Sequence, residues 1–147
     1  MEWTNPDCPF VKKHYDSKNM QALQEKYTAQ GAVWLSICSS APGKQGHYSA
    51  AEWKDILARQ GSRATALLLD PEGKAGLAYA AKTTPHMFVI DAAGILVYDG
   101  AIDDKPSTQA DDIPGSKALL AEAVDAVLAG QPVPVSKTVP YGCSVKY

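Results

Sequence analysis

Cys8 and Pro85 lie in two distant segments whose residue types point to thiol chemistry. The first segment is Asn5-Pro6-Asp7-Cys8-Pro9-Phe10. A proline directly after Cys8 suits the first turn of a helix, because the amide that it lacks needs no partner there. A cysteine at a helix start lies among unpaired amides and near the positive end of the helix dipole, which favours thiolate over thiol. The sequence therefore predicts a reactive Cys8, and the alternative is a small buried hydrophobic residue.

The second segment runs from Thr83 to Asp91 and turns at Pro85 into a short apolar strand. A proline is tolerated at the first residue of a strand, and the Thr84–Pro85 bond is a candidate cis peptide. His86 follows directly, and an imidazole near Cys8 can stabilise a thiolate or exchange protons. Cys8 and His86 alone do not form a metal ligand set, so no metal site is predicted.

Two further side chains, those of Lys12 and Cys143, are candidates to assist the chemistry of Cys8. Lys12, four residues on, is predicted to share its helix face and to favour the thiolate. A thiol oxidised by peroxide returns to the cycle through a disulfide with a second thiol, and Cys143 is the candidate for that role. The chain between Gly130 and Cys143, at about 3.3 Å per residue, is long enough to cross a small domain.

The roles of the remaining cysteines and histidines are more limited. For Cys143 the sequence leaves open an exposed, tail-anchoring thiol or a structural disulfide with Cys8. Cys38 ends an apolar strand, so we expect it to be buried. His14 is expected to face solvent on the first helix, and His47 lies in a loop.

The pattern of apolar residues and caps predicts alternating helices and strands. Ser49 and Glu52 have the spacing of a capping box. The expected helices cover 9–29 (kinked near 17–19), 50–61, 74–81 and 115–129, and the expected strands cover 32–38, 64–69, 87–91 and 95–98. This order predicts one α/β domain, 1–147, with a mixed sheet, and residues 131–147 form an extended tail that carries Cys143.

Composition narrows the function classes. The chain has 147 residues, 46% of them hydrophobic, and a net charge of -2, which does not suit a nucleic-acid partner. Its apolar runs are far shorter than the roughly 20 residues of a membrane helix. Because Met1 stands almost at the Cys8 segment, we expect natural sequence upstream. The odd number of cysteines leaves a cytoplasmic or a periplasmic location open.

Four separated blocks resemble the peroxiredoxin-like (AhpC/TSA, or redoxin) family of thioredoxin-fold proteins. They are Glu2 to Tyr15, Thr84 to Asp91, Gly100 to Asp104, and Tyr141 to Tyr147. The resemblance covers nearly the whole chain. It implies a thioredoxin-like sandwich without most of the first strand and without the opening hairpin, and it makes Pro85 the cis-proline beside the active cysteine. It further implies a disulfide or peroxide substrate and a reductant such as thioredoxin or a small thiol, with no cofactor.

The chain departs from the family pattern at several positions. In a Cys-x-x-Cys motif ending at Cys8, Asn5 takes the place of the first cysteine. Asn5 and Pro85 also stand where peroxiredoxins carry a threonine or serine and an arginine, so we do not expect efficient peroxide reduction. The shortened first strand predicts an uncovered sheet edge, which another subunit can pair.

These observations predict a thiol-disulfide oxidoreductase or weak thiol peroxidase. Cys8 is the nucleophile and Cys143 the resolving thiol; the supporting residues are Asn5, Pro9, Lys12, Thr84, Pro85 and His86. The first alternative is a non-catalytic thioredoxin-fold module that holds an extended peptide at the Pro85 groove by strand addition. The second is a truncated domain without an independent function.

Overall fold

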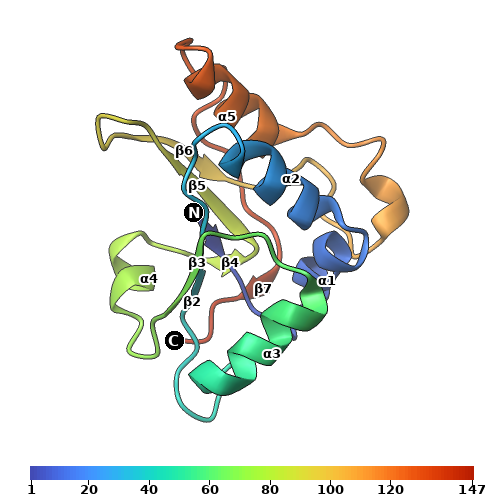
Figure 1. Cartoon of the computed structure of the whole chain (residues 1–147), viewed down its shortest axis with the longest axis vertical. Coiled ribbons are helices and arrows are strands. Elements are labelled where there is room, and N and C mark those ends of the chain that lie inside the picture. The colour runs from blue at the N-terminus through green and yellow to red at the C-terminus, as the bar shows by residue number, and fades with distance from the viewer.

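A five-stranded mixed sheet forms the centre of the computed structural model, which describes residues 1–147 (Figure 1). The strand order is β3 (Ala66–Leu69), β2 (Leu35–Cys38), β1 (Glu2–Trp3), β5 (His86–Ile90) and β6 (Leu96–Gly100). β1, β2 and β3 are parallel to one another, whereas β5 is antiparallel to both β1 and β6. The predicted α/β class with a mixed sheet and flanking helices is confirmed.

Helices cover both faces of the sheet unequally. The helices are α1 (Pro9–Asp16), α2 (Asn19–Thr28), α3 (Ala50–Gln60), α4 (Lys74–Ala78) and α5 (Leu119–Leu128), with a 3-10 turn at Ala110–Asp112. The largest core cluster joins α1, α2 and α5 to one face of the sheet and includes Cys8. A smaller cluster around Trp3 and Phe88 lies on the other face, next to α4, which stands apart from the other helices in Figure 1.

β1 is only two residues long, yet it lies inside the sheet. It pairs with β2 on one side and with β5 on the other, and the edges of the sheet are β3 and β6. The prediction that the short first strand leaves an uncovered edge is therefore wrong. The prediction failed because a strand's position in a sheet depends on crossover connections, which its length does not reveal.

The side chain of Glu2 fastens β1 to the elements around it. Its fully buried carboxylate accepts hydrogen bonds from Trp34 Nε1 (2.9 Å), Tyr15 Oη (3.0 Å) and Ser36 Oγ (3.2 Å). Burial raises the pKa of Glu2, and these hydrogen bonds lower it in part. Because Tyr15 belongs to α1, this network fixes the helix that begins beside Cys8.

The expected helix 9–29 is divided into α1 and α2. Lys18 adopts a left-handed conformation (φ 65°) between them. Beside it, Ser17 Oγ donates to His14 O and accepts from the Asn19 amide. Short polar side chains of this kind compete with the helical hydrogen bonds. The chain therefore forms two separate helices here instead of one kinked helix.

The C-terminal helix also begins later than expected. The segment 115–118 lies outside α5, and there the Lys117 amide donates to Asp104 Oδ1 (2.8 Å). By contrast, the capping box of α3 is present: Glu52 N donates to Ser49 Oγ, and the Ser49 amide donates to the Glu52 carboxylate. Gly61, with φ 65°, ends that helix.

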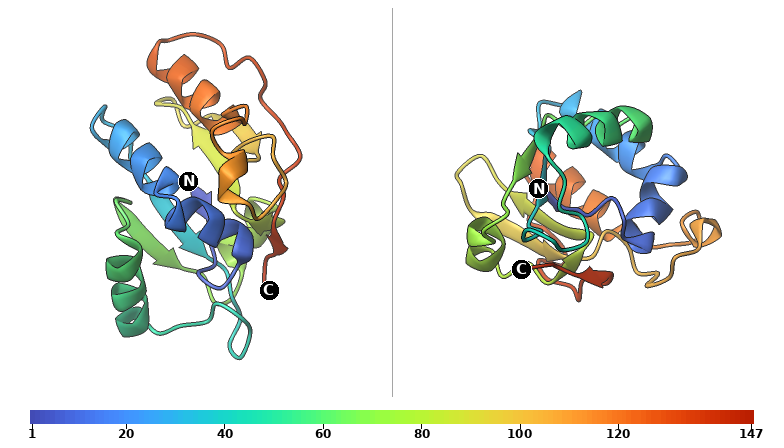
Figure 2. Two further views of the ribbon diagram at one scale, coloured as in Figure 1. Left: turned by 90° about the vertical axis from the view of Figure 1, so that its right-hand side faces the viewer. Right: turned by 90° about the horizontal axis from the view of Figure 1, so that it is seen from below.

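The tail 131–147 crosses the molecule from α5 to its opposite end (Figure 2). Along the way, Thr138 bonds the Tyr98 hydroxyl (2.8 Å) and the Ala101 amide (2.9 Å). The tail then forms β7 (Cys143–Ser144), which pairs antiparallel with β4 (Thr83–Thr84). It ends against α4, where Tyr147 Oη donates to Ala81 O (2.7 Å). None of the helices is long and apolar enough to span a membrane.

Candidate functional site

Cys8 occupies the N-cap of α1, as the sequence predicts. Its backbone is extended (φ -74°, ψ 124°), Pro9 opens the helix, and the Lys12 amide donates to Cys8 O (2.9 Å). The side chain has no exposed surface, and Sγ donates to Thr84 O (2.9 Å). The sulfur therefore lies at the positive end of the helix and against the Thr84–Pro85 segment.

Cys143 is brought beside Cys8 by strand pairing. Thr84, whose carbonyl accepts from Cys8, is the register partner of Cys143 in the β4–β7 ladder. The two cysteines therefore lie close to each other, and neither is in a disulfide. The tail thus brings a second sulfur to Cys8 from 135 positions along the sequence.

The pKa values of the two thiols are shifted in opposite directions. Burial alone raises the pKa of Cys8, but the neighbouring Cys143 and Thr84 side chains favour the thiolate and outweigh burial, so the pKa falls below its ordinary value. Burial and the neighbouring Cys8 sulfur raise the pKa of Cys143 to about 11. The two thiols therefore titrate as a pair, and loss of a proton is favoured at the Cys8 sulfur over the Cys143 sulfur.

Thr84 and Gly142 shape the contact between β4 and β7. The Thr84–Pro85 peptide is cis, which confirms that prediction. The Thr84 hydroxyl is buried and has no hydrogen-bond partner while the Cys8 thiol donates to the carbonyl of the same residue. Gly142 lies so close that a Cβ there would stand 2.1 Å from Thr84 O. Only a residue without a side chain permits this approach.

Asn5 supports the loop that follows β2 and does not bond the sulfur. Its Nδ2 donates to Gln45 O (3.2 Å), and its Oδ1 accepts from the Asp7 amide (3.0 Å). Gly46 packs directly on this side chain. Asn5, predicted as a supporting residue of the site, thus bonds the neighbouring loop rather than the Cys8 sulfur. The helix N-cap, where a nucleophile gains from the dipole, is the position of Cys8 itself.

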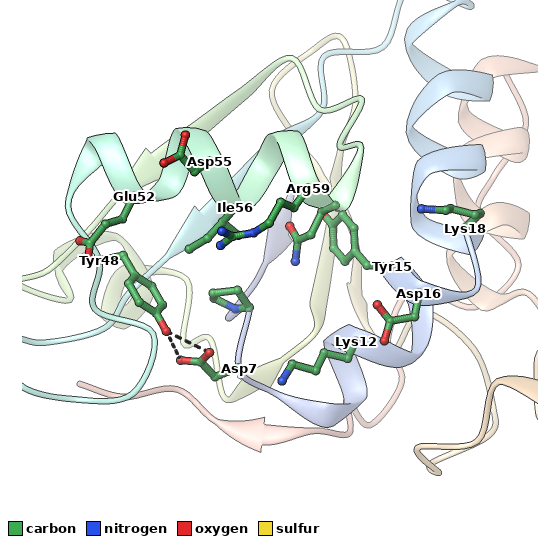
Figure 3. Close-up of a pocket in the computed structure, with 12 residues that line it drawn as sticks. Asp7, Lys12, Tyr15, Asp16, Lys18, Tyr48, Glu52, Asp55, Ile56 and Arg59 are labelled. Carbon is green, nitrogen blue, oxygen red and sulfur yellow. Dashed lines mark hydrogen bonds between the residues drawn. The ribbon is translucent and has the colours of Figure 1, made fainter.

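Lys12 does not share a face with Cys8, so that prediction is wrong. Cys8 is fully buried in the core cluster that also contains Val11, whereas the Lys12 side chain points to solvent. Lys12 is exposed and lines a polar groove of about 670 Å³ between α1 and α3. Figure 3 shows its ammonium extending toward Asp7, whose carboxylate accepts from Tyr48 Oη (2.9 Å), while Arg59 enters the groove from α3.

His86 faces the side of the sheet opposite to Cys8. It pairs with Trp3 and stacks on Phe88 (ring centroids 4.3 Å apart), whereas the next residue, Met87, packs in the Cys8 cluster. Its Nε2 bonds Asp99 Oδ1 (2.7 Å), and its Nδ1 accepts from the Lys82 amide (3.2 Å). Burial lowers the pKa of His86 despite Asp99. The expected help to the thiolate is corrected, because adjacent strand residues point to opposite faces.

A buried polar cluster near the tail was not predicted. It consists of Lys13, His14, Asp103 and Tyr141. The prediction that His14 faces solvent is wrong, since it has no exposed surface, and burial lowers its pKa to about 4. The Tyr141 hydroxyl donates to the Asp103 carboxylate. Nothing in the local pattern signals this cluster, because its members are joined only by the folded chain.

Cys38 stands apart from the thiol pair and is buried, as predicted. Its Sγ lies 3.4 Å from Ser40 Oγ and 3.5 Å from Gly46 O. Burial raises its pKa, so Cys38 is the less acidic of the two buried thiols.

Comparison with known proteins finds the same fold in solved structures whose function is not described. Neither a protein-family model nor a curated protein matches the chain. An uncharacterized conserved protein from Geobacillus kaustophilus is similar, with a TM-score of 0.81 and 26% identity over 99% of this chain and 75% of that one. A hypothetical protein from Sinorhizobium meliloti 1021 has a TM-score of 0.75 and 26% identity, covering 99% of this chain and 77% of the other. The fold therefore recurs in solved structures along essentially the whole length of the chain.

Proposed function

We propose that the chain is a thiol-disulfide oxidoreductase with a thioredoxin-like fold of the peroxiredoxin-like branch, in which Cys8 is the nucleophile and Cys143 resolves the mixed disulfide. The observation that carries this proposal is that β7 places Cys143 opposite Thr84, whose carbonyl accepts from the Cys8 thiol, with the pKa lowered at Cys8 and raised at Cys143. A buried cysteine in a purely structural role needs neither feature.

The reaction follows from this ordering of acidities. The Cys8 thiolate attacks one sulfur of a substrate disulfide, forms a mixed disulfide and expels a substrate thiolate, which takes up a proton. Cys143 then gives up its proton and attacks the Cys8 sulfur. This step forms the Cys8–Cys143 disulfide and releases the second substrate sulfur as a thiol. Two electrons pass to the substrate, and an external thiol reductant such as thioredoxin restores the pair.

Peroxide is the second substrate class of the same site. Attack of the Cys8 thiolate on the O–O bond gives a sulfenic acid and releases water or an alcohol, and Cys143 then condenses with the sulfenic acid and releases water. The site has no cation beside Cys8 to stabilise the departing oxygen: Lys12 is exposed in the groove, and His86 is bonded to Asp99. We therefore expect slow peroxide turnover relative to disulfide exchange.

The alternative function, capture of an extended peptide beside Pro85, uses the strand position that β7 occupies. The Thr83–Thr84 strand is already paired by Cys143 and Ser144, so an outside peptide has to displace the tail. The same displacement exposes Cys8 to a disulfide substrate. Peptide binding without thiol turnover is the result that favours this alternative.

A redox titration tests the proposal. The Cys38→Ser protein is equilibrated with mixtures of reduced and oxidised glutathione, free thiols are trapped by alkylation, and the products are mapped by mass spectrometry. We expect one intramolecular disulfide, Cys8–Cys143, and its loss in Cys8→Ser and in Cys143→Ser. Absence of this disulfide in every mixture, together with no thiol-dependent reduction of an aromatic disulfide, would overturn the oxidoreductase function.

A further inference from the structure

We propose that the contact between Asp103 and Tyr141 is a latch that positions Cys143 against Cys8 and thereby sets the reduction potential of the pair. This inference rests on the proposed function, because it concerns the same two thiols. Asp103 and Tyr141 are positioning residues: they act on Cys143 through the tail and do not touch the reacting sulfurs.

The latch joins the tail to the loop after β6 and to the helix that begins at Cys8. The Tyr141 hydroxyl donates to Asp103 Oδ1 and lies 3.4 Å from His14 Nε2 on α1. The tyrosine ring packs edge-on against Phe10 (centroids 5.9 Å apart), and Lys13 Nζ lies 5.5 Å from its centroid. Both the ring and the hydroxyl of Tyr141 are therefore held by α1 and its neighbours.

The cluster contains two buried charged groups, Lys13 and Asp103, beside the imidazole of His14, which is uncharged near neutral pH. The side chains of Lys13 and His14 are fully buried and that of Asp103 is 4% exposed. Lys13 Nζ donates to Lys105 O (2.9 Å), while Asp103 Oδ2, 3.8 Å away from it, has no hydrogen-bond partner. Burying charged groups with incomplete pairing is costly. The tail residue on which they converge is Tyr141.

Tyr141 is close enough along the chain to control Cys143. Only Gly142 separates the two residues, and it is wedged against Thr84 O. A shift of Tyr141 therefore moves the β7 strand relative to β4. On the other side of Cys143 the tail is held by neutral backbone hydrogen bonds, from the Val145 amide to Lys82 O (3.1 Å) and from the Ala41 amide to Lys146 O (2.8 Å). The ion pair of Lys137 with Asp99 lies farther from Cys143 along the tail. Charge-assisted hydrogen bonds are stronger than neutral ones, so the bond from Tyr141 to Asp103 is stronger than the neutral hydrogen bonds that hold the tail near Cys143.

Loss of the latch should lower the effective concentration of the Cys143 thiol at Cys8, and the equilibrium constant of the Cys8–Cys143 disulfide measures this change. Tyr141→Phe keeps the ring and removes only the hydroxyl. Since a hydrogen bond to a charged group is involved, we expect the equilibrium constant for forming the Cys8–Cys143 disulfide to fall on the order of tenfold. For this two-electron couple, that change is a rise of about 30 mV in the reduction potential.

The experiment measures this potential in glutathione buffers, in the Cys38→Ser background. Tyr27→Phe is the matched control, because it removes a phenol hydrogen bond to Ala121 O (3.2 Å) at a distance from the tail. Asp103→Asn is the second latch variant and decides the matter if Tyr141→Phe does not fold. We expect both latch variants to become more oxidising and the control to match the parent.

Two outcomes separate the latch from the function on which it rests. If the parent protein forms the Cys8–Cys143 disulfide and the latch variants have the same potential as Tyr27→Phe, the latch is overturned and the thiol pair stands. If the parent forms no such disulfide, the proposed function itself fails.

Discussion

The acidity of Cys8 depends on single neighbouring groups, among them the hydroxyl of Thr84. That hydroxyl is buried and bonds no group while Cys8 is a thiol, so it is available to donate to the thiolate, which lowers the pKa of Cys8. Thr84→Val, which keeps the shape, should therefore raise the pKa of Cys8 at little cost in stability. We expect slower alkylation of Cys8 at neutral pH and a rate profile displaced to higher pH. Thr28→Val, on the outer part of α2, is the control, and a profile identical to it would refute the role of Thr84.

Gly142 is the residue that permits β7 to lie on β4. Its φ is +144°, and a Cβ would stand 2.1 Å from a backbone carbonyl oxygen that cannot rotate away. Gly142→Ala should displace β7, slow the formation of the Cys8–Cys143 disulfide and uncover Cys8 to alkylation. Gly43→Ala is the matched control, because Gly43 also has a positive φ (+78°) but no atoms near the position of its Cβ. Equal effects of the two substitutions would show that backbone strain alone is responsible.

At the scale of elements, α3 owes its start to local capping and is separate from the thiol pair. The Ser49 side chain accepts from Glu52 N, and the core side chains of α3 pack with Cys38 rather than with Cys8. Ser49→Ala should lower the free energy of unfolding by about 1 kcal/mol. The alkylation rate of Cys8 should stay unchanged. Denaturant unfolding and the alkylation assay check both statements, and a changed rate would mean that α3 is coupled to the site.

Elements whose ends are set by local contacts are the ones that a sequence predicts well. The bounds of α3 are set by residues within the helix or next to it, so its capping box and Gly61 are visible in the sequence. The start of α5 has no comparable signal, because Ala118 makes no side-chain cap, and the Lys117 amide before it bonds Asp104, thirteen positions away. The break at Lys18 depends on a left-handed residue that is neither glycine nor asparagine. Contacts of these kinds leave no local pattern.

The site residues likewise divide into those with a local sequence signal and those placed by long-range contacts. Cys8 and Pro85 carry chemical signals of their own, a proline after a cysteine and a proline before a strand, and the structure places them as predicted. Cys143 reaches Cys8 because the tail pairs with β4, which its length allows but does not require. Lys12 and His86 are predicted as site residues because they are close to Cys8 and Pro85 in the sequence. In the structure Lys12 is exposed in the groove, and strand alternation places His86 on the face of the sheet opposite to Cys8.

For the whole molecule, two buried ionisable groups make stability depend on pH in opposite directions. Burial raises the pKa of Glu2 above 4.5, so its contribution to stability is fully present below pH 4.5 and is lost as pH rises through the raised value. His14 behaves in the opposite way. Burial lowers its pKa from 6.5 to about 4, with a nearby Asp103 opposing the change and Lys13 adding to it.

The contribution of His14 is therefore present above pH 6.5 and is lost as pH falls toward 4, because only the unfolded imidazole binds a proton in this window. Since a tenfold change in proton affinity corresponds to about 1.4 kcal/mol, the loss is on the order of 3 kcal/mol. His14→Gln should be less stable at neutral pH but should have a flatter dependence between these limits. His47→Gln, at an exposed loop position, should keep the parent slope. Urea unfolding across this range measures the slopes, and a parent slope retained in His14→Gln would assign the acid sensitivity to the carboxylates instead.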